Sequence, residues 1–427
     1  MSINKHSQSS LLDYIYSSGL PIDEVLVWLV SLSVIAKENA NNFHELCDVK
    51  SENQKELFFN IIKKSEFLKK HDLSQRLIPS DQFISPDVLA MLITYIKNVT
   101  DFNTFADELT KAFQKLASRE VEDSITDQVI VEIIKGIVGD TSQLTIYDGA
   151  AGLCSVTSQM VAKKTLLEDI NSKSVAIGKS ILFLKNIDFE YALTNSLTSH
   201  RKSVNADLVV TQAPWGVRFS PKDIEQIKES KYIQLKDNKQ IPTSANDSLW
   251  IQHSIYHLNE NGRAIVLMPQ GWLFRGGYDA ELRNHLLESD LIEAVIGLPS
   301  GLLKNTTIPS VLLIFNKNKL NKNIVHFIDA SKFGRKEKRQ LQLSIAEINL
   351  ITNSVTGASL SDSSYYRAVP CNEINKNNNN LSISRYFFDE VQWKTYDLKH
   401  EIKLLEKAQQ NFSFADKKLM DLLADQI

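Results

Sequence analysis

The apolar residues of the first 120 positions recur at three- and four-residue spacing, which is typical of amphipathic helices. Ser85-Pro86-Asp87 and 101–104 resemble the starts of two further helices, because proline is tolerated in a first turn. No metal-binding or nucleophile arrangement is evident in this part of the chain. We therefore expect residues 1–120 to form a helical interaction domain, with its first helices at 11–16, 23–39 and 55–70.

From about residue 127, short β-branched apolar runs alternate with helical segments. This alternation predicts an α/β domain over 121–330, with a mostly parallel sheet covered by helices on both faces. Such sheets bind ligands beyond the carboxyl ends of their strands. The runs are 144–147, 165–167, 206–211, 263–268, 291–298 and 311–316, and the helical segments are 129–138, 174–185, 248–258 and 279–287.

Residues 331–427 read as a C-terminal extension. It opens with a basic run that either contacts DNA phosphates or forms a solvated loop, comprising Lys332, Arg335, Lys336, Lys338 and Arg339. Leu398, Ile402 and Leu405 have helical spacing, and Leu419 and its leucine neighbours follow after a break. We expect one or two amphipathic helices, which either dock onto a partner or serve as ordinary packing helices of this protein.

Composition narrows the classes of function. The 48 Lys and Arg residues against 51 Asp and Glu give a net charge of −3, so contact with nucleic acid needs a local patch or a partner's charge. The three cysteines lie far apart, which fits a reducing cytoplasm and argues against structural zinc. The longest apolar run, 25–36, is shorter than the roughly 20 residues of a membrane span, and no signal-like segment opens the chain. We expect a cytoplasmic protein without membrane contact.

The first candidate site follows the predicted strand 144–147. Asp148 ends that strand, and the small residues up to Gly152 let a ligand approach the backbone. Asp169 stands 21 positions after Asp148, at the end of the next strand, where an acid binds the ribose hydroxyls of a nucleoside cofactor. The alternative is a turn with two surface acids.

The second candidate site follows the strand 206–211, as Gln212-Ala213-Pro214-Trp215. An exocyclic base amine is a poor nucleophile because its lone pair is delocalised into the ring. A side-chain amide oxygen and a backbone carbonyl that accept its two hydrogens leave the lone pair free for a methyl donor, and an aromatic ring stacks on the extruded base. The alternative is an ordinary turn with a core tryptophan.

Together with three further segments, these motifs resemble the N-6 adenine DNA methylase family, and within it the modification subunit of type I restriction–modification systems. The segments are 262–269 with 273–277, 295–299, and Asn380-Leu381-Ser382-Ile383-Ser384-Arg385-Tyr386. The resemblance implies a Rossmann-like class I methyltransferase domain with a helical N-terminal domain and a helical C-terminal tail. It also implies S-adenosyl-L-methionine as the cofactor and N6 of a flipped adenine in double-stranded DNA as the methyl acceptor. The implied partners are a DNA-specificity subunit, a restriction subunit and a second copy of the chain.

The same resemblance assigns roles to individual residues. The cofactor-binding residues that it implies are Thr126, Asp148, Gly152, Asp169 and Asn195. Gln212, Ala213, Pro214 and Trp215 occupy the catalytic tetrad, which in the family reads Asn-Pro-Pro-Phe or Asn-Pro-Pro-Tyr. No metal is implied, since His253 and His257 share a helix face without a third ligand.

Several of these positions depart from the family pattern. Cys154 replaces a glycine and is expected to crowd the ligand, and Asn195 lacks the family's carboxylate. The amide of Gln212 lies one methylene further from the backbone, about one bond length, and a shift of about 1 Å can cost on the order of a hundredfold in rate. Two hypotheses remain: an active adenine-N6 methyltransferase subunit of a restriction–modification or phage-defence complex, and a degenerate scaffold that assembles with proteins and DNA.

Overall fold

The computed structural model divides the chain into two compact units, Met1–Phe387 and Phe388–Ile427, which are described separately. Within them the structure describes residues 11–73, 75–80, 82, 84–116, 125–199, 201–235, 240–303, 306–337, 340–356, 361–387 and 398–424.

The described part of residues 11–116 contains seven helices, so the predicted helical character of this region is confirmed, although the helix Ala40–Asp48 was not predicted. The two predicted helix starts are confirmed: the Ser85 hydroxyl accepts a hydrogen bond from the Val88 N–H, and the Asp101 carboxylate accepts from Asn103 and Thr104. The single helix expected at 55–70 is wrong, because Ser65 caps a new helix there and accepts from the Leu68 N–H at 3.1 Å. The helices are α1 Leu11–Ser17, α2 Ile22–Glu38, α3 Ala40–Asp48, α4 Ser51–Ile62, α5 Glu66–Lys70, α6 Pro86–Lys97 and α7 Phe102–Leu116.

A nine-stranded sheet forms the centre of the first unit, in the order β11-β8-β6-β7-β5-β4-β1-β2-β3. The five strands from β5 to β3 run parallel, and β7 is antiparallel to both β5 and β6. The mostly parallel sheet is therefore confirmed. Its strands are β1 Thr145–Asp148, β2 Lys164–Asp169, β3 Phe189–Leu193, β4 Ala206–Thr211, β5 Leu258–Pro269, β6 Ile292–Gly297, β7 Ser310–Asn316, β8 Ile324–Asp329 and β11 Tyr366–Pro370.

Successive side chains of the central strands enter different hydrophobic cores, because strand residues alternate between the two faces of a sheet. On β7, Leu312 and Ile314 pack with α9 Gln128–Val138 and α14 Ile345–Thr356. Val311, Leu313 and Phe315 pack with α12 Asn246–Tyr256 and α13 Tyr278–Glu288. Both faces are thus buried, which explains why these strands read as continuous apolar runs.

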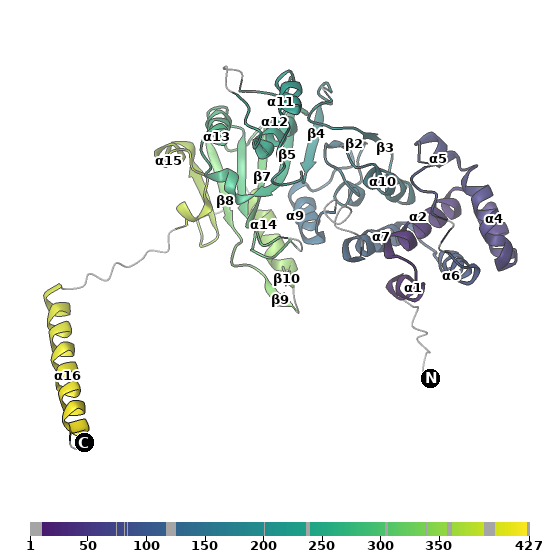
Figure 1. The fold of residues 1–427 in the computed structure, drawn as a ribbon. Helices are drawn as coiled ribbons and strands as arrows, with labels where there is room; N and C mark the ends of the chain where they lie inside the picture. Colours follow the sequence, from purple (N-terminus) through teal and green to yellow (C-terminus); the bar gives the residue numbers. More distant parts are fainter. Residues whose placement is uncertain are drawn as a thin grey trace, which may run out of the picture. The chain divides into compact units, whose positions relative to one another are not determined.

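The N-terminal helices share their hydrophobic core with α10 Ser172–Leu184, the helix that follows β2. Ala176, Ile177 and Ile181 of α10 are buried in the same cluster as Trp28 and Phe113. The Phe67 and Phe183 rings stack with centroids 4.3 Å apart. Figure 1 shows α2, α5 and α7 gathered beside α10 at the β3 end of the sheet.

The described part of the second unit is one helix, α16 Leu398–Ala424. The break expected before Leu419 is wrong, since no glycine or proline interrupts the helix. Of the expected basic run, Lys338 and Arg339 lie outside the described residues. Lys332 is exposed, and Arg335 and Lys336 lie on β9 Arg335–Glu337, which pairs with β10 Gln340–Gln342. Across the described residues, no helix has the length and apolar character needed to cross a membrane.

Candidate functional site

A cavity of about 200 Å³ opens beyond the carboxyl ends of β1, β2 and β4. The structure brings six of the nine predicted site residues to its wall: Thr126, Asp148, Asp169, Asn195, Gln212 and Pro214. The other three, Gly152, Ala213 and Trp215, do not line it. The cavity lies at the sheet edge where the strand order predicts a ligand.

Asp148 is the last residue of β1, and its side chain is 6% exposed. Its carboxylate accepts a hydrogen bond from the Ala150 N–H at 2.9 Å. The pKa of Asp148 is raised to about 8, chiefly by burial; the hydrogen bond from Ala150 opposes the rise and the neighbouring charge of Asp169 adds to it. A carboxyl group with this pKa holds its proton at neutral pH unless a ligand favours the charged form.

Asp169 ends β2 and ties together the two loops of the site. One carboxylate oxygen accepts from the Gly152 N–H at 2.8 Å, and the other accepts from the Asn171 N–H at 2.7 Å. Burial raises the pKa of Asp169, and these backbone donors oppose the rise. Gly152 thus contributes to the site by holding Asp169 rather than by lining the cavity.

Cys154 does not crowd the cavity, and the expectation that it would is wrong. Its backbone is left-handed, with φ +61°, as at a glycine, but its side chain is buried away from the cavity wall. There it packs in a cluster with Leu167 and Tyr191, whose hydroxyl donates to the Gly152 carbonyl at 2.6 Å. The cysteine therefore fills space behind the loop.

Thr126 and Asn195 approach the cavity from two loops. The Thr126 N–H donates to the Ser155 hydroxyl at 3.3 Å, which joins the segment before α9 to the loop after β1. The Asn195 side-chain oxygen accepts from the Leu197 N–H at 3.2 Å. Both contacts shape their loops, and both residues remain on the cavity wall.

Gln212 follows β4 directly, and its side-chain oxygen is buried without a hydrogen-bond partner among the described residues. Leaving such an acceptor unsatisfied costs about 1–3 kcal/mol, so this atom is available to a ligand donor. Ala213 is buried in a cluster with Leu197 and Trp250. Trp215 lies against the core on the α9 and α14 side, and its indole N–H donates to the Leu267 carbonyl at 3.4 Å.

Two residues of α12 belong to this site although the sequence did not mark them. Trp250 lines the cavity and is 7% exposed. Asn246 donates from its side-chain nitrogen to the Pro214 carbonyl at 2.8 Å, and its own buried side-chain oxygen has no partner among the described residues. Helical spacing alone predicted α12, but only the packing of α12 beside β4 reveals these contacts.

A polar network fixes the first turn of α12. Arg275 forms ion pairs with Asp247 and with Asp279, and Asp279 accepts from Ser248 at 2.5 Å. Arg283 donates to the Trp272 and Arg275 carbonyls at 2.6 and 2.8 Å. These contacts give Arg275 and Arg283 a structural role beside the first turn of α12, which carries Asn246.

The histidines of α12 lie in a cluster of aromatic rings, packed edge to face or tilted, behind the cavity. The rings of His253 and His257 are 4.5 Å apart, and the His257 ring is 4.5 Å from the Tyr147 ring. Burial lowers the pKa of His253 well below its usual value and that of His257 to about 3, so both are neutral. The described residues contain no group of three or more side chains suited to hold a metal ion.

Comparison with known proteins identifies the family. The model of the N-6 DNA methylase family matches residues 109–394, well over half of the chain. The MpnII type I restriction enzyme methylase subunit of Mycoplasma pneumoniae is 25% identical over 71% of this chain and 60% of its own length. The MjaVIII methylase subunit of Methanocaldococcus jannaschii is 31% identical over 54% of this chain and 39% of its own length. The chain thus spans about three fifths or less of these relatives.

Solved structures show the same fold. The methyltransferase subunit of a type I restriction–modification system from Streptococcus thermophilus superposes with a TM-score of 0.69 at 19% identity, covering 88% of this chain and 97% of that one. A chain from a type I restriction–modification complex gives a TM-score of 0.64 at 15% identity, covering 97% of both chains. The Rossmann-like methyltransferase fold with helical N- and C-terminal regions is therefore confirmed. On the match over residues 109–394, the chain belongs to the N-6 DNA methylase family.

Proposed function

We propose that this chain is the DNA methyltransferase subunit of a type I restriction–modification complex. It transfers a methyl group from S-adenosyl-L-methionine to N6 of an adenine flipped out of double-stranded DNA. One observation carries the proposal: the side-chain oxygen of Gln212, which has no hydrogen-bond partner among the described residues, lies on the wall of the same cavity as Asp148 and Asp169. One cavity thus holds an oxygen that can accept a hydrogen bond from an amine and two acids that can bind the hydroxyls of a nucleoside.

The cavity fits a nucleoside cofactor in its chemistry. Asp148 and Asp169 end neighbouring parallel strands, and each carboxylate keeps lone pairs beyond its backbone hydrogen bonds, which ribose hydroxyls can use. Trp250 adds a buried aromatic ring to the wall. When bound, S-adenosyl-L-methionine supplies an electrophilic methyl group on a sulfonium.

The chain's own contribution to the transfer is to orient the target amine. The Gln212 side-chain oxygen accepts one hydrogen of N6, and the Ala213 carbonyl accepts the other. The lone pair of the nitrogen is then directed at the methyl group, and water is kept out by the surrounding walls. Trp215 is proposed to stack on the flipped base, a movement that requires its ring to leave the Leu267 carbonyl.

A catalytically inactive scaffold is the second candidate function. It is favoured by Gln212, because the glutamine side chain is one methylene longer than the family's asparagine and shifts the amide from its usual place. Cys154 no longer supports it, because the cysteine side chain packs away from the cavity and does not obstruct a ligand. Both functions keep the fold, and they differ in cofactor binding and in methyl transfer.

Calorimetric titration of S-adenosyl-L-methionine into the full chain is the first test. Micromolar binding that is lost in Asp169→Ala supports the enzyme, and absence of binding at millimolar cofactor supports the scaffold. Transfer of a labelled methyl group to DNA is then measured with the specificity partner present. An active enzyme changes its rate in Gln212→Asn, whereas a scaffold shows no methylation before or after this substitution.

Partner binding is proposed to use α16. Leu398, Leu405, Phe412 and Leu419 recur every seven residues and are exposed, with Ile402 beside them. A seven-residue apolar repeat is typical of helices that pair in coiled coils. We infer that this stripe packs on helices of a DNA-specificity subunit, and that the assembly also holds a second copy of this chain and a restriction subunit.

Co-purification of the full chain with its specificity partner tests this inference. Leu405→Glu is expected to abolish the complex, because it places a charge in the apolar stripe. Lys403→Glu reverses a charge away from that stripe and serves as the control. Retention of the partner by Leu405→Glu would contradict this docking surface.

A further inference from the structure

A second cavity of about 120 Å³ adjoins the candidate site. Thr126 and Ser155 line both cavities, so the two are neighbours across the contact between these residues. The remaining walls come from α7, from the start of α9 and the chain leading into it, and from the segment between β1 and β2: Asp107, Thr110, Lys111, Gln114, Ile125, Gln128 and Gln159.

The first cavity alone is small for its proposed ligand. Pockets for ligands of this class usually have about 300–1,000 Å³, and the first cavity has about 200 Å³. Asp169 and Asn195 line only the first cavity. For a ligand whose ribose and base lie near these two residues, Thr126 and Ser155 offer the other end a route into the second cavity.

The walls of the second cavity are polar, and Lys111 is a cation on them that has no partner among the described residues. Asp107 is neutralised by Lys185, whose ammonium is 2.5 Å away, and it also accepts from Gln159 at 2.5 Å. Gln114 donates to Asp127 at 2.8 Å. The Lys111 ammonium makes no ion pair or hydrogen bond within the part of the chain that the structure describes. Its positive charge is therefore available to an anionic group of a ligand.

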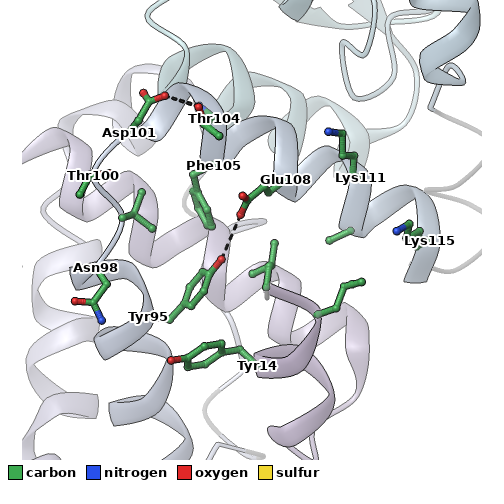
Figure 2. Close-up of a pocket in the computed structure, with 14 residues that line it drawn as sticks. Tyr14, Tyr95, Asn98, Thr100, Asp101, Thr104, Phe105, Glu108, Lys111 and Lys115 are labelled. Carbon is green, nitrogen blue, oxygen red and sulfur yellow. Dashed lines mark hydrogen bonds between the residues drawn. The ribbon is translucent and has the colours of Figure 1, made fainter. Parts of the chain in front are cut away.

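Lys111 stands on the boundary between two cavities. It also lines a wider cavity of about 750 Å³ between α1, α6 and α7. Figure 2 shows Lys111 and Lys115 projecting from α7 there, with Tyr14, Tyr95 and Glu108 further along the wall. Lys115 lines only the wider cavity, so the two lysines form a matched pair for a test.

We propose that the second cavity binds the amino-acid end of the cofactor, and that Lys111 pairs with its carboxylate. The side-chain oxygens of the glutamines and of Asp107 accept from the α-ammonium group. The inference rests on the proposed function and deepens it. It makes α7, a helix of the N-terminal region, part of the cofactor site rather than of an interaction surface alone.

Two ligands that differ only in this end provide the test. S-adenosylhomocysteine carries the amino-acid chain on its thioether sulfur, and 5′-methylthioadenosine carries a methyl group there. Calorimetry on the full chain is expected to show that Lys111→Met weakens S-adenosylhomocysteine binding by about tenfold to a hundredfold, the value of one charge-assisted hydrogen bond. Binding of 5′-methylthioadenosine is expected to stay within about twofold, since it makes no contact with Lys111.

Three controls sharpen the result. Lys115→Met is expected to leave both affinities unchanged, and Lys111→Arg to keep most of the affinity for S-adenosylhomocysteine. An analogue that keeps the amino group but lacks the carboxylate is expected to bind the original chain and Lys111→Met equally well. Lys111 is exposed, so its variants are expected to melt at the same temperature as the original chain.

The outcomes separate the inference from the function on which it rests. If both ligands bind the original chain and Lys111→Met weakens neither, or weakens both equally, the role of Lys111 is refuted while the cofactor site stands. If neither ligand binds the original chain at millimolar concentration, the proposed function and this inference fall together.

Discussion

The side-chain nitrogen of Asn246 lies 2.8 Å from the carbonyl oxygen of Pro214, so α12 holds the loop that follows β4. Asn246 is 3% exposed and belongs to the first turn of α12, which Arg275 braces through Asp247. The carbonyl of Ala213, one residue earlier, is the proposed second acceptor of the target amine. The hydrogen bond from Asn246 therefore fixes the backbone on which that acceptor depends.

Replacing Asn246 is expected to slow methyl transfer without weakening the binding of the cofactor. Asn246→Asp keeps the shape but removes the donor to Pro214, and a misplaced acceptor costs about tenfold to a hundredfold in kcat. Single-turnover methylation with the specificity partner measures the rate, and calorimetry measures cofactor affinity. Equal losses in kcat and in affinity would point to a general collapse of the site instead.

Removing the Gln212 amide is expected to abolish most of the activity. Gln212→Ala deletes a buried side-chain oxygen of this wall that has no partner among the described residues, and we expect kcat to fall by more than about a hundredfold. Because the variant also removes an unsatisfied polar atom, its free energy of unfolding is expected to equal or exceed that of the original chain. Thermal unfolding and labelled-methyl transfer check the two effects. A variant with undiminished methylation would exclude Gln212 from catalysis.

The buried carboxyl of Asp148 gives stability a defined pH dependence. Its pKa in the folded chain is about 8, above its ordinary value near 4, so the folded state retains a proton that the unfolded chain releases between these values. This contribution is present in full below about pH 4 and is lost as the pH rises toward about 8.

Melting curves of the ligand-free chain from pH 5 to pH 9 measure this effect. The Tm is expected to decline toward pH 8, and Asp148→Asn is expected to flatten the decline because the amide does not titrate. Asp188→Asn, which changes an exposed carboxyl, serves as the control. An unchanged slope in Asp148→Asn would assign the decline to other groups.

Replacing Cys154 by glycine is expected to leave cofactor affinity within about twofold, because the side chain packs behind the loop. The change relieves a left-handed backbone, worth about 1–2 kcal/mol. It also removes a side chain from the buried cluster that includes Leu167 and Tyr191, and small buried deletions cost a similar amount. Chemical denaturation is expected to show a net change below about 1 kcal/mol. A large gain in affinity would restore the idea that Cys154 obstructs the ligand.

Local patterns in the sequence predicted that three of the candidate residues stand at one edge of the sheet, and the structure places them there. Asp148, Asp169 and Gln212 each stand at the end of an apolar run, and parallel pairing brings the ends of such runs to one edge of the sheet. The sequence pattern could not show that Cys154 turns away from that edge, because this depends on space left by Tyr191 on another strand. Nor could it show that Trp250 reaches the cavity. The direction of the Cys154 side chain and the position of Trp250 both depend on contacts between different helices and strands, which a local pattern does not contain.

The long helix at the end of the chain illustrates a different limit. Helical spacing predicted its apolar stripe, but a polar interval suggested a break that is absent. Polar residues on one side of an exposed helix do not interrupt it, since only glycine and proline seriously disfavour helical backbone. The prediction was therefore wrong about the continuity of the helix, whereas the apolar stripe along it is present as predicted.

The hydrophobic core that α10 shares with the N-terminal helices has a consequence for recombination between related genes. Ile177 and Ile181 are buried in the same cluster as Trp28 and Phe113, so a crossover between residues 116 and 128 would join halves whose side chains had never been selected together. Viable exchange of N-terminal segments is expected only when α10 is inherited with them. The seam at which such genes can be recombined therefore lies beyond Leu184, well inside the sheet domain.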